Sequence, residues 1–183
     1  MMQRRFLLAA FAAAALLPAG AAQAQPRAPA STKEARRRLS LEHLHSGEAI
    51  DIVYHQNGRY VPSALYDLNR FLRDHRDGTV HPIDVDVLDY LHAVAAKLGT
   101  RAPIGIVCGY RSERSNELLR ARSSGVARRS LHMDGMALDI RIPGQRVRKV
   151  AEAALSLQRG GVGIYTGSNF VHIDSGAVRN WGA

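Results

Sequence analysis

Residues 130–142 read SLHMDGMALDIRI, and this stretch decides the fold that we predict for the chain. A polar turn with a glycine at its centre leads into a strand in which apolar and polar side chains alternate. Because alternate side chains of a strand share a face, Leu138, Ile140 and Ile142 point to one side. Asp139 points to the other side, so we expect its carboxylate on the face of the sheet that turns away from the core.

The last strand of the chain carries the same pattern. Val171 and Ile173 form its apolar face, and His172 and Asp174 share the opposite one. If this strand and the strand of Asp139 are neighbours in one sheet, their polar faces bring Asp139 and His172 together. His132, which lies just before the glycine turn, then folds over both.

Two imidazoles and one carboxylate form a plausible catalytic zinc site. Zinc binds nitrogen at about 2.0 to 2.1 Å and carboxylate oxygen at about 2.0 to 2.2 Å, and a catalytic site leaves a fourth position open for water. Zinc lowers the pKa of such a water to about 7, so the implied chemistry is hydrolysis. An ordinary polar turn of Ser, His, Asp and Gly is the alternative that this spacing leaves open.

The rest of the sequence predicts one α+β domain with a mostly antiparallel sheet, because hairpin-like strands gather towards its end. Asp84 is a good N-cap for a helix that Gly99 ends, and Ser112 caps another. We expect strands at 39–45, 49–54, 104–108, 136–142, 162–165 and 170–173, and helices from 63, after 84, at 113–122 and at 147–157.

The N-terminal residues have the features of an export signal. Two arginines precede the apolar run 6–17, and small residues follow, so we predict a signal peptide at 1–24. The run is too short for a membrane span, and no integral membrane segment is expected in the mature chain. The arginine pair fits both a twin-arginine signal and an ordinary one. Residues 25–38 are interpreted as a flexible leader, and 39–183 as the domain.

The charge of the chain favours anionic partners. The 183 residues carry a formal net charge of +9, and without Arg4 and Arg5 of the signal it is +7. Outside the cytoplasm such a surface suits a carboxylate-rich cell-wall polymer or lipid headgroups, and nucleic acid is a poor candidate. The single cysteine, Cys108, lies in an apolar strand and is interpreted as a small buried residue rather than a nucleophile.

Three ordered motifs carry a resemblance to a known family. They are the serine, histidine, glycine, alanine and aspartate of 130–139, the Gly-Tyr-Arg-Ser of 109–112, and the Phe-Val-His-Ile-Asp of 170–174. Together they resemble the D-alanyl-D-alanine metallopeptidase superfamily, with its Hedgehog/DD-peptidase-like fold. Residues 41–48 and 174–181 are similar to the YcbK-like branch of murein endopeptidases, so the resemblance covers nearly all of 39–181.

The resemblance implies an exported, periplasmic zinc peptidase that acts on peptidoglycan stem peptides, and we expect it to be a monomer. Its ligands for one zinc ion would be His132, Asp139 and His172. Arg111 would lie beside the scissile carbonyl and stabilise the developing oxyanion. Tyr110 and Ser130 would contact the substrate, although a turn hydroxyl is the other interpretation of Ser130.

One departure from the family pattern concerns the general base. Several relatives have an acidic residue three positions before the last histidine ligand, where this chain has Asn169. Asp174 is one candidate for the base, and orienting a metal ligand is the other role that fits its position. The family also contains D-alanyl-D-alanine carboxypeptidases, and Asn169 leaves room for an inactive zinc-containing cell-wall binding module.

Two further groups of ring side chains have more than one interpretation. His43 and His45 are expected as polar residues on the exposed side of an edge hairpin rather than as a second metal pair. Trp181 and Tyr165 fit either a substrate groove or a capping role against the core.

Overall fold

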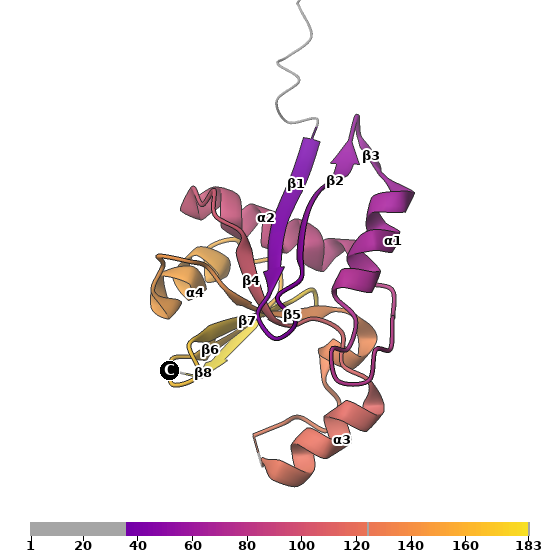
Figure 1. Ribbon diagram of the computed structural model, residues 1–183. Coiled ribbons are helices and arrows are strands. Elements are labelled where there is room, and N and C mark those ends of the chain that lie inside the picture. The colour runs from indigo at the N-terminus through magenta and orange to yellow at the C-terminus, as the bar shows by residue number, and fades with distance from the viewer. Residues whose placement is uncertain (1–35, 124, 183) are drawn as a thin grey trace, which may run out of the picture. The chain divides into compact units, whose positions relative to one another are not determined.

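The computed structural model describes residues 36–123 and 125–182, which form an α+β structure around one large sheet (Figure 1). The strands are β1 (Arg36–His43), β2 (Ala49–Gln56), β3 (Arg59–Tyr60), β4 (Ile104–Cys108), β5 (Ala137–Arg141), β6 (Gly161–Tyr165), β7 (Phe170–Asp174) and β8 (Arg179–Gly182). The helices are α1 (Pro62–Phe71), α2 (Val85–Leu98), α3 (Glu113–Arg122) and α4 (Val147–Leu155), with a 3-10 turn at Leu131–Asp134.

The sheet has the strand order β3-β2-β1-β4-β5-β7-β6-β8. Neighbours are antiparallel except at the pairs β1–β4 and β6–β8, which are parallel. This arrangement confirms the predicted α+β class with a mostly antiparallel sheet. Helices α1, α2 and α4 pack on the sheet, whereas α3 projects at the lower end of the view in Figure 1.

The hydrophobic core lies between the sheet and these three helices. Helix α2 supplies much of it, because its apolar residues recur at helical spacing and face the strands. Its ends follow the prediction: the Asp84 carboxylate accepts a hydrogen bond from the backbone N–H of Asp86, and Gly99 adopts the left-handed conformation at the C-cap. The strand residues Leu138, Ile140 and Ile142 are all buried in this core, as the alternation predicted.

The start of the domain was predicted too late. Strand β1 begins at Arg36, so the last three residues assigned to the leader are part of the sheet. Arg37 pairs with Asp89 of α2, and Arg38 pairs with Asp51 of β2. A run of three arginines resembles a solvated linker in sequence, but here neighbouring carboxylates hold it in a strand. Residues 1–24 and 25–35 lie outside the described residues.

The prediction of an edge hairpin was also wrong, and so was the exposed position of His43, whereas His45 is exposed as expected. Strand β1 lies between β2 and β4, so it is not an edge strand. His43 follows Leu39 and Leu41 on the core face and is only 1% exposed, while His45 lies beyond the strand in an exposed turn. The parallel partner β4 is distant in sequence, and a local pattern cannot reveal it.

Several short elements were not predicted. Strands β3 and β8 and the 3-10 turn at Leu131–Asp134 are all four residues or fewer. Helix α4 ends at Leu155, two residues before the predicted end. None of the helices among residues 36–123 and 125–182 is long and apolar enough to span a bilayer.

The packing of α2 against the sheet makes a stability prediction. Leu88 is fully buried, and replacing it with alanine is expected to lower the free energy of unfolding by about 2 to 5 kcal/mol, because the lost methyl groups leave a cavity. Leu118 of α3 is 50% exposed, and Leu118→Ala is the matched control, with an expected change below about 1 kcal/mol. Urea denaturation measures both, and equal losses would contradict this assignment of the core.

Candidate metal centre

The sheet register brings the first two predicted ligands together. Strands β5 and β7 are antiparallel neighbours, and Asp139 lies directly opposite His172. Their side chains share the face of the sheet that is opposite the buried Ile140 and Val171. Both residues are nevertheless recessed below the surface, with exposed fractions of 6% and 8%.

His132 reaches the same point from the 3-10 turn before β5. Gly135 ends this turn with a φ of 68°, a conformation that favours glycine. A Cβ atom there would also lie 2.2 Å from the carbonyl oxygen of Pro82, so no other residue fits without a shift of the backbone. The turn therefore sets His132 over the sheet, where its side chain is buried.

Three ligand atoms of these residues form a small triangle. His132 Nε2 lies 3.2 Å from Asp139 Oδ1 and 3.1 Å from His172 Nδ1, and His172 Nδ1 lies 2.9 Å from Asp139 Oδ1. A tetrahedral zinc ion with bonds of about 2.0 to 2.2 Å holds its ligand atoms about 3.3 to 3.6 Å apart. The three side chains therefore fit one zinc ion after small movements, and they leave a fourth position without a protein ligand from this set.

The other ring nitrogen of each imidazole has its own partner. His132 Nδ1 lies 2.7 Å from the carbonyl oxygen of Gly109, to which it donates, and this leaves Nε2 free to bind a metal. His172 Nε2 lies 3.1 Å from Asp174 Oδ2 and donates to that carboxylate. Ligand histidines in metal sites almost always have such partners, which fix the tautomer and the direction of the ring.

The charges of the cluster are strongly coupled. Burial alone would lower the pKa of His132, but the Asp139 carboxylate and the Cys108 thiol outweigh burial and raise that pKa to about 10. Burial would raise the pKa of Asp139, yet His132 and His172 bring it well below its ordinary value. Asp139 is therefore charged near neutral pH, as a metal ligand must be.

Asp174 lies on the far side of His172 from the triangle. Its carboxylate is fully buried and accepts hydrogen bonds from the backbone N–H groups of Gly161 and Gly176, at 3.0 and 2.9 Å. Arg179 donates to it at 2.7 Å. These contacts outweigh burial and hold the pKa of Asp174 well below its ordinary value. This geometry favours the orienting role considered for Asp174 over the role of general base.

Arg111 and Cys108 complete the surroundings of the triangle. Arg111 Nη2 lies 3.8 Å from Asp139 Oδ2, the carboxylate oxygen that is outside the triangle, and 3.5 Å from Cys108 Sγ. The Arg111 Nε–H is buried and has no hydrogen-bond partner among the described residues. The positive charge and the unpaired Nε–H of Arg111 therefore lie beside the predicted ligands, where they can stabilise negative charge on a carbonyl oxygen.

Cys108 is buried as predicted, but its position beside the predicted metal ligands was not expected. A ligand atom from each of Cys108, His132 and Asp139 lies within 4.8 Å of the others, so the thiol is a further possible metal donor. The atoms contributed by His172 are closer, at 2.9 to 3.2 Å, and form the tighter set. The register of β4 against β5 shifts between Ile106 and Cys108, and this bulge places Cys108 opposite Asp139.

The other predicted site residues lie around this cluster. Tyr110 stacks on His81 with ring centroids 4.7 Å apart. Ser130 precedes the 3-10 turn, and its hydroxyl makes no capping hydrogen bond. Asn169 is exposed in the turn between β6 and β7, with a φ of 55°. No carboxylate of the described residues other than Asp139 and Asp174 contacts the two histidine ligands.

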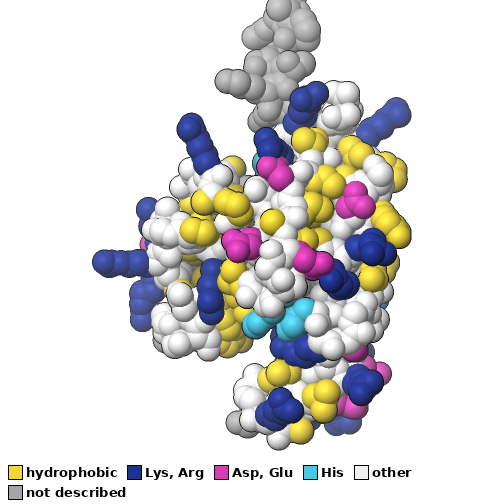
Figure 2. All heavy atoms as spheres, viewed as in Figure 1, with side chains coloured by type: hydrophobic (Ala, Val, Ile, Leu, Met, Phe, Trp, Pro, Cys, Tyr) yellow, Lys and Arg dark blue, Asp and Glu magenta, His cyan; other side chains and the backbone are white. Residues whose placement is uncertain are grey.

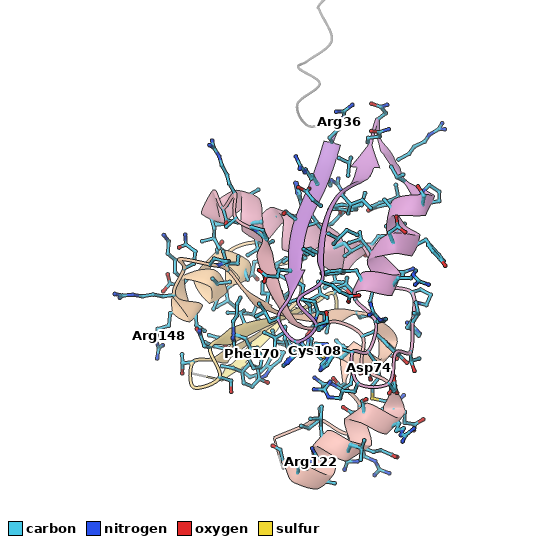
Figure 3. All side chains as sticks on the ribbon, in the orientation of Figure 1. Arg36, Asp74, Cys108, Arg122, Arg148 and Phe170 are labelled. Carbon is cyan, nitrogen blue, oxygen red and sulfur yellow. The ribbon has the colours of Figure 1, made fainter. Side chains whose placement is uncertain are left out.

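The aromatic residues near the C-terminus lie beside the cluster rather than against the hydrophobic core. The ring centroid of Trp181 is 5.2 Å from that of His172, and its Nε1–H donates to the Tyr165 hydroxyl at 2.9 Å. Trp181 lies over Gly163, where a Cβ atom would be 2.8 Å from the indole. Tyr165 in turn stacks on Phe170. Phe170 belongs to β7 and Cys108 to β4, the two strands that flank β5, and Figure 3 labels both residues.

Comparisons with known proteins identify the family of the chain. Residues 30–181 match the model of a family described as peptidoglycan L,D-endopeptidase MepK. The chain is 44% identical over 145 residues to the Escherichia coli (strain K12) protein called peptidoglycan L,D-endopeptidase MepK, which covers 79% of this chain and 80% of the relative. It is 38% identical over 146 residues to a Haemophilus influenzae protein called probable peptidoglycan L,D-endopeptidase MepK, with 79% of this chain and 78% of the relative covered. The chain therefore belongs to the family of the peptidoglycan L,D-endopeptidase MepK.

Proposed function

We propose that the chain is a zinc-dependent endopeptidase that hydrolyses L,D peptide cross-links of peptidoglycan. The observation that carries the proposal is the triangle of His132 Nε2, Asp139 Oδ1 and His172 Nδ1, with edges of 2.9 to 3.2 Å. Zinc held there would supply a Lewis acid and lower the pKa of a bound water. The names of the two relatives supply the class of bond, which the sequence motifs alone did not distinguish.

The side chains around the zinc ligands have separate roles in this proposal. Arg111 stabilises the negative charge that develops on the carbonyl oxygen of the scissile bond, since its guanidinium lies within 3.8 Å of the ligand Asp139. Asp174 acts through His172, whose Nε2–H it accepts, and holds the ring in the orientation that directs Nδ1 to the metal. Tyr110 and Ser130 contact the stem peptide at the edge of the site.

The relatives favour this function over the two alternatives. Both are called endopeptidases rather than carboxypeptidases, and the ligand triangle together with Arg111 offers a metal centre and a cation for the developing oxyanion. An inactive binding module would need no cation beside the ligand carboxylate. The Asn169 position, which prompted that alternative, lies in an exposed turn three residues before His172.

The cellular setting is part of the proposal. Residues 1–24 are an export signal of the twin-arginine or the ordinary type, residues 25–35 are a leader, and the remaining chain is a Hedgehog/DD-peptidase-like zinc peptidase domain that works as a monomer in the periplasm. Figure 2 shows Lys and Arg side chains scattered over the visible face rather than gathered in one patch. Such a surface suits loose attraction to an anionic polymer, while specificity comes from the site.

Digestion of cross-linked sacculi tests the proposal. The mature protein with zinc is expected to release fragments whose masses correspond to cleavage at L,D cross-links, and a chelator is expected to stop this release. Added zinc should restore it. Fragments that show only loss of terminal D-alanine would support a carboxypeptidase, and intact sacculi in the presence of a zinc-loaded protein would support a binding module.

Arg111 gives a sharper test of turnover. Arg111→Ala is expected to lower kcat by about 100- to 1,000-fold, because a donor to the developing oxyanion is lost. Zinc content, measured by atomic absorption, should stay near one ion per chain. Arg148→Ala is the matched control, since Arg148 is exposed on α4 (Figure 3) and makes none of the hydrogen bonds or ion pairs found among the described residues. Unchanged kcat in Arg111→Ala would contradict the oxyanion role.

A further inference from the structure

Arg111 lies in a short connection rather than in a helix or a strand. Residues 109–112 join the end of β4 to the start of α3, and three successive backbone N–H groups of this connection have distant partners. The N–H of Tyr110 donates to the carbonyl oxygen of Leu72 at 2.8 Å, and that of Arg111 donates to the carbonyl oxygen of His132 at 3.0 Å. The position of the Arg111 guanidinium therefore depends on the groups that hold this connection from outside.

The third N–H of the connection donates to a buried carboxylate. The backbone nitrogen of Ser112 lies 2.9 Å from Oδ2 of Asp74, a fully buried residue next to the first turn of α3 (Figure 3). The Ser112 hydroxyl donates to Asp77 Oδ2 at 2.6 Å. Two carboxylates of one turn, residues 74–79, thus hold the backbone and the side chain of the same serine. We call residues 74–79 the acidic turn.

Hydrogen bonds within the acidic turn fix its own shape. The backbone N–H of Asp74 donates to the carbonyl oxygen of Thr79 at 2.9 Å, and the Asp74 carbonyl oxygen accepts from the N–H of Gly78 at 2.8 Å. The second carboxylate oxygen, Asp74 Oδ1, accepts from the backbone N–H of Arg76 at 2.9 Å. Burial would raise the pKa of Asp74, but hydrogen bonds from serine and backbone groups outweigh it and lower that pKa. The carboxylate is therefore charged near neutral pH and is a strong acceptor.

Ser112 passes this restraint to Arg111 in two ways. It is the neighbour of Arg111 in the chain, so a shift of the serine backbone moves the arginine with it. Ser112 is also the N-cap of α3, and its carbonyl and hydroxyl oxygens accept the N–H groups of Asn116 and Ser115 at 2.9 and 3.1 Å. Asn116 is buried, and its Oδ1 accepts from Arg111 Nη1 at 3.4 Å. The acidic turn therefore supports the arginine through the backbone and through the helix.

The ligand His132 is held by other groups. Its Nδ1 donates to the carbonyl oxygen of Gly109, and Gly109 packs closely on the backbone of Leu72. A Cβ atom at Gly109 would lie 2.5 Å from the Leu72 carbonyl oxygen. This support comes from backbone groups, which a substitution at Asp74 does not remove. Loss of the Asp74 carboxylate is therefore expected to displace Arg111 without releasing zinc.

We propose that Asp74 and Asp77 are positioning residues for Arg111. Through Ser112 they hold the guanidinium beside Asp139, with Arg111 Nη2 3.8 Å from Oδ2 of that carboxylate, so that its charge meets the carbonyl oxygen of the scissile bond. In the part of the chain that the structure describes, neither carboxylate has a hydrogen bond or ion pair to a metal ligand. This inference rests on the proposed function, because it depends on the oxyanion role of Arg111.

A double-mutant cycle in the zinc-loaded enzyme tests this role. Asp74→Asn keeps the size of the side chain, but its NH2 group donates, so one of the backbone N–H groups that Asp74 accepts loses its acceptor. On a purified L,D-cross-linked peptide, kcat is expected to fall about 10- to 100-fold, with KM and zinc content little changed, because the guanidinium is misplaced. In the Arg111→Ala background the same substitution should change kcat by less than about twofold, since residues that act as a unit are not additive.

Asp89→Asn is the matched control for lost stability. Asp89 of α2 is a partly buried carboxylate that accepts from the hydroxyls of Tyr54 and Tyr60, both at 2.8 Å, and pairs with Arg37. None of these partners belongs to the Arg111 connection, so Asp89→Asn should lower the melting temperature and leave kcat unchanged below it. A loss of kcat as large as that in Asp74→Asn would show that stability alone decides, and would overturn the positioning role.

Asp77→Ala keeps the inference testable if Asp74→Asn does not fold, because Asp77 is exposed. It should lower kcat about threefold to tenfold, since one hydrogen bond to Ser112 is lost, and only while Arg111 is present. Unchanged kcat in the folded variants, or losses that add to that of Arg111→Ala, would overturn the positioning role alone if the wild type is active. A zinc-loaded wild type that cleaves none of the cross-linked peptide would overturn the proposed function, and this inference with it.

Discussion

Replacing His132 with alanine is expected to remove zinc from the protein and to abolish peptide hydrolysis. His132 Nε2 is one corner of a triangle with edges of 3.1 and 3.2 Å to the other two ligand atoms. A site reduced to one imidazole and one carboxylate loses most of its affinity for zinc. We expect kcat/KM to fall by at least about 1,000-fold, to the background of the assay.

The same variant is expected to change stability as well as activity. Zinc binds the folded chain and not a preformed site in the unfolded one, so its loss removes stabilisation that depends on the zinc concentration. The melting temperature of the wild type should therefore rise with added zinc, and that of His132→Ala should not. His45→Ala is a matched control, because His45 lies in an exposed turn. Zinc binding and a zinc-dependent melting temperature in His132→Ala would contradict the ligand set.

Zinc retention should also depend on pH in a defined direction. Burial would lower the pKa of His132, but Asp139 and Cys108 outweigh it and raise the pKa to about 10, so a proton competes with zinc for this nitrogen. Falling pH increases the proton concentration and weakens zinc binding, and rising pH strengthens it until other ligands of zinc interfere. Equilibrium dialysis at several pH values measures this competition, and zinc retention in the wild type that does not change with pH would contradict it.

The sequence predicts which side chains of β5 and β7 share the polar face of the site, but not how the strands pair around it. The alternation in β5 and β7 was sufficient to place Asp139 and His172 on one face, because a strand has a fixed period of two. It was not sufficient to show that they lie directly opposite each other, since register depends on the pairing of distant segments. The place of His132 just before the glycine turn suggested the third member of the predicted ligand set, and the turn at Gly135 explains how its side chain reaches the other two.

Features that arise from tertiary structure were missed for identifiable reasons. Cys108 lies beside Asp139 only because β4 has a bulge before it, and a bulge leaves no clear mark in an apolar run. The buried His43 was expected at an edge because its parallel partner, β4, begins about sixty residues later. Strand β8 is too short to show a period, although it carries the Trp181 ring that lies beside His172.

Asp174→Asn is expected to weaken zinc binding about 10- to 100-fold, because partners of ligand histidines orient the ring and raise its basicity. Asparagine is of nearly equal size, but it has no charge to pair with Arg179. Its amide oxygen is also a poorer acceptor than a carboxylate for the His172 Nε2–H. Competition with a chelator measures the affinity. Asp67→Asn is a matched control, since Asp67 is exposed on α1 and makes none of the hydrogen bonds or ion pairs found among the described residues.

The two roles considered for Asp174 differ in what excess zinc can restore. If Asp174 orients His172, kcat of Asp174→Asn recovers substantially once zinc saturates the site. A general base would give the opposite result, a loss of about 100-fold or more in kcat at unchanged zinc affinity. The buried position of Asp174 behind His172 favours the first outcome, and the second would contradict the orienting role.

Acid stability provides an independent measurement of the same carboxylate. Burial would raise the pKa of Asp174, but hydrogen bonds from His172, Arg179 and two backbone N–H groups outweigh it and bring the pKa below its ordinary value. Asp174 therefore stabilises the fold above the unfolded-state pKa of about 4, and this contribution is lost as the pH falls towards the lower folded-state value. Asp174→Asn should be less stable than wild type at neutral pH by about 1 to 3 kcal/mol, since a buried charged acceptor is lost. The difference should shrink in melts recorded from pH 6 down to pH 3, because the unfolded wild-type chain then binds a proton at Asp174 that the folded chain does not. A difference that stays constant over this range would show that the charge of Asp174 does not stabilise the fold.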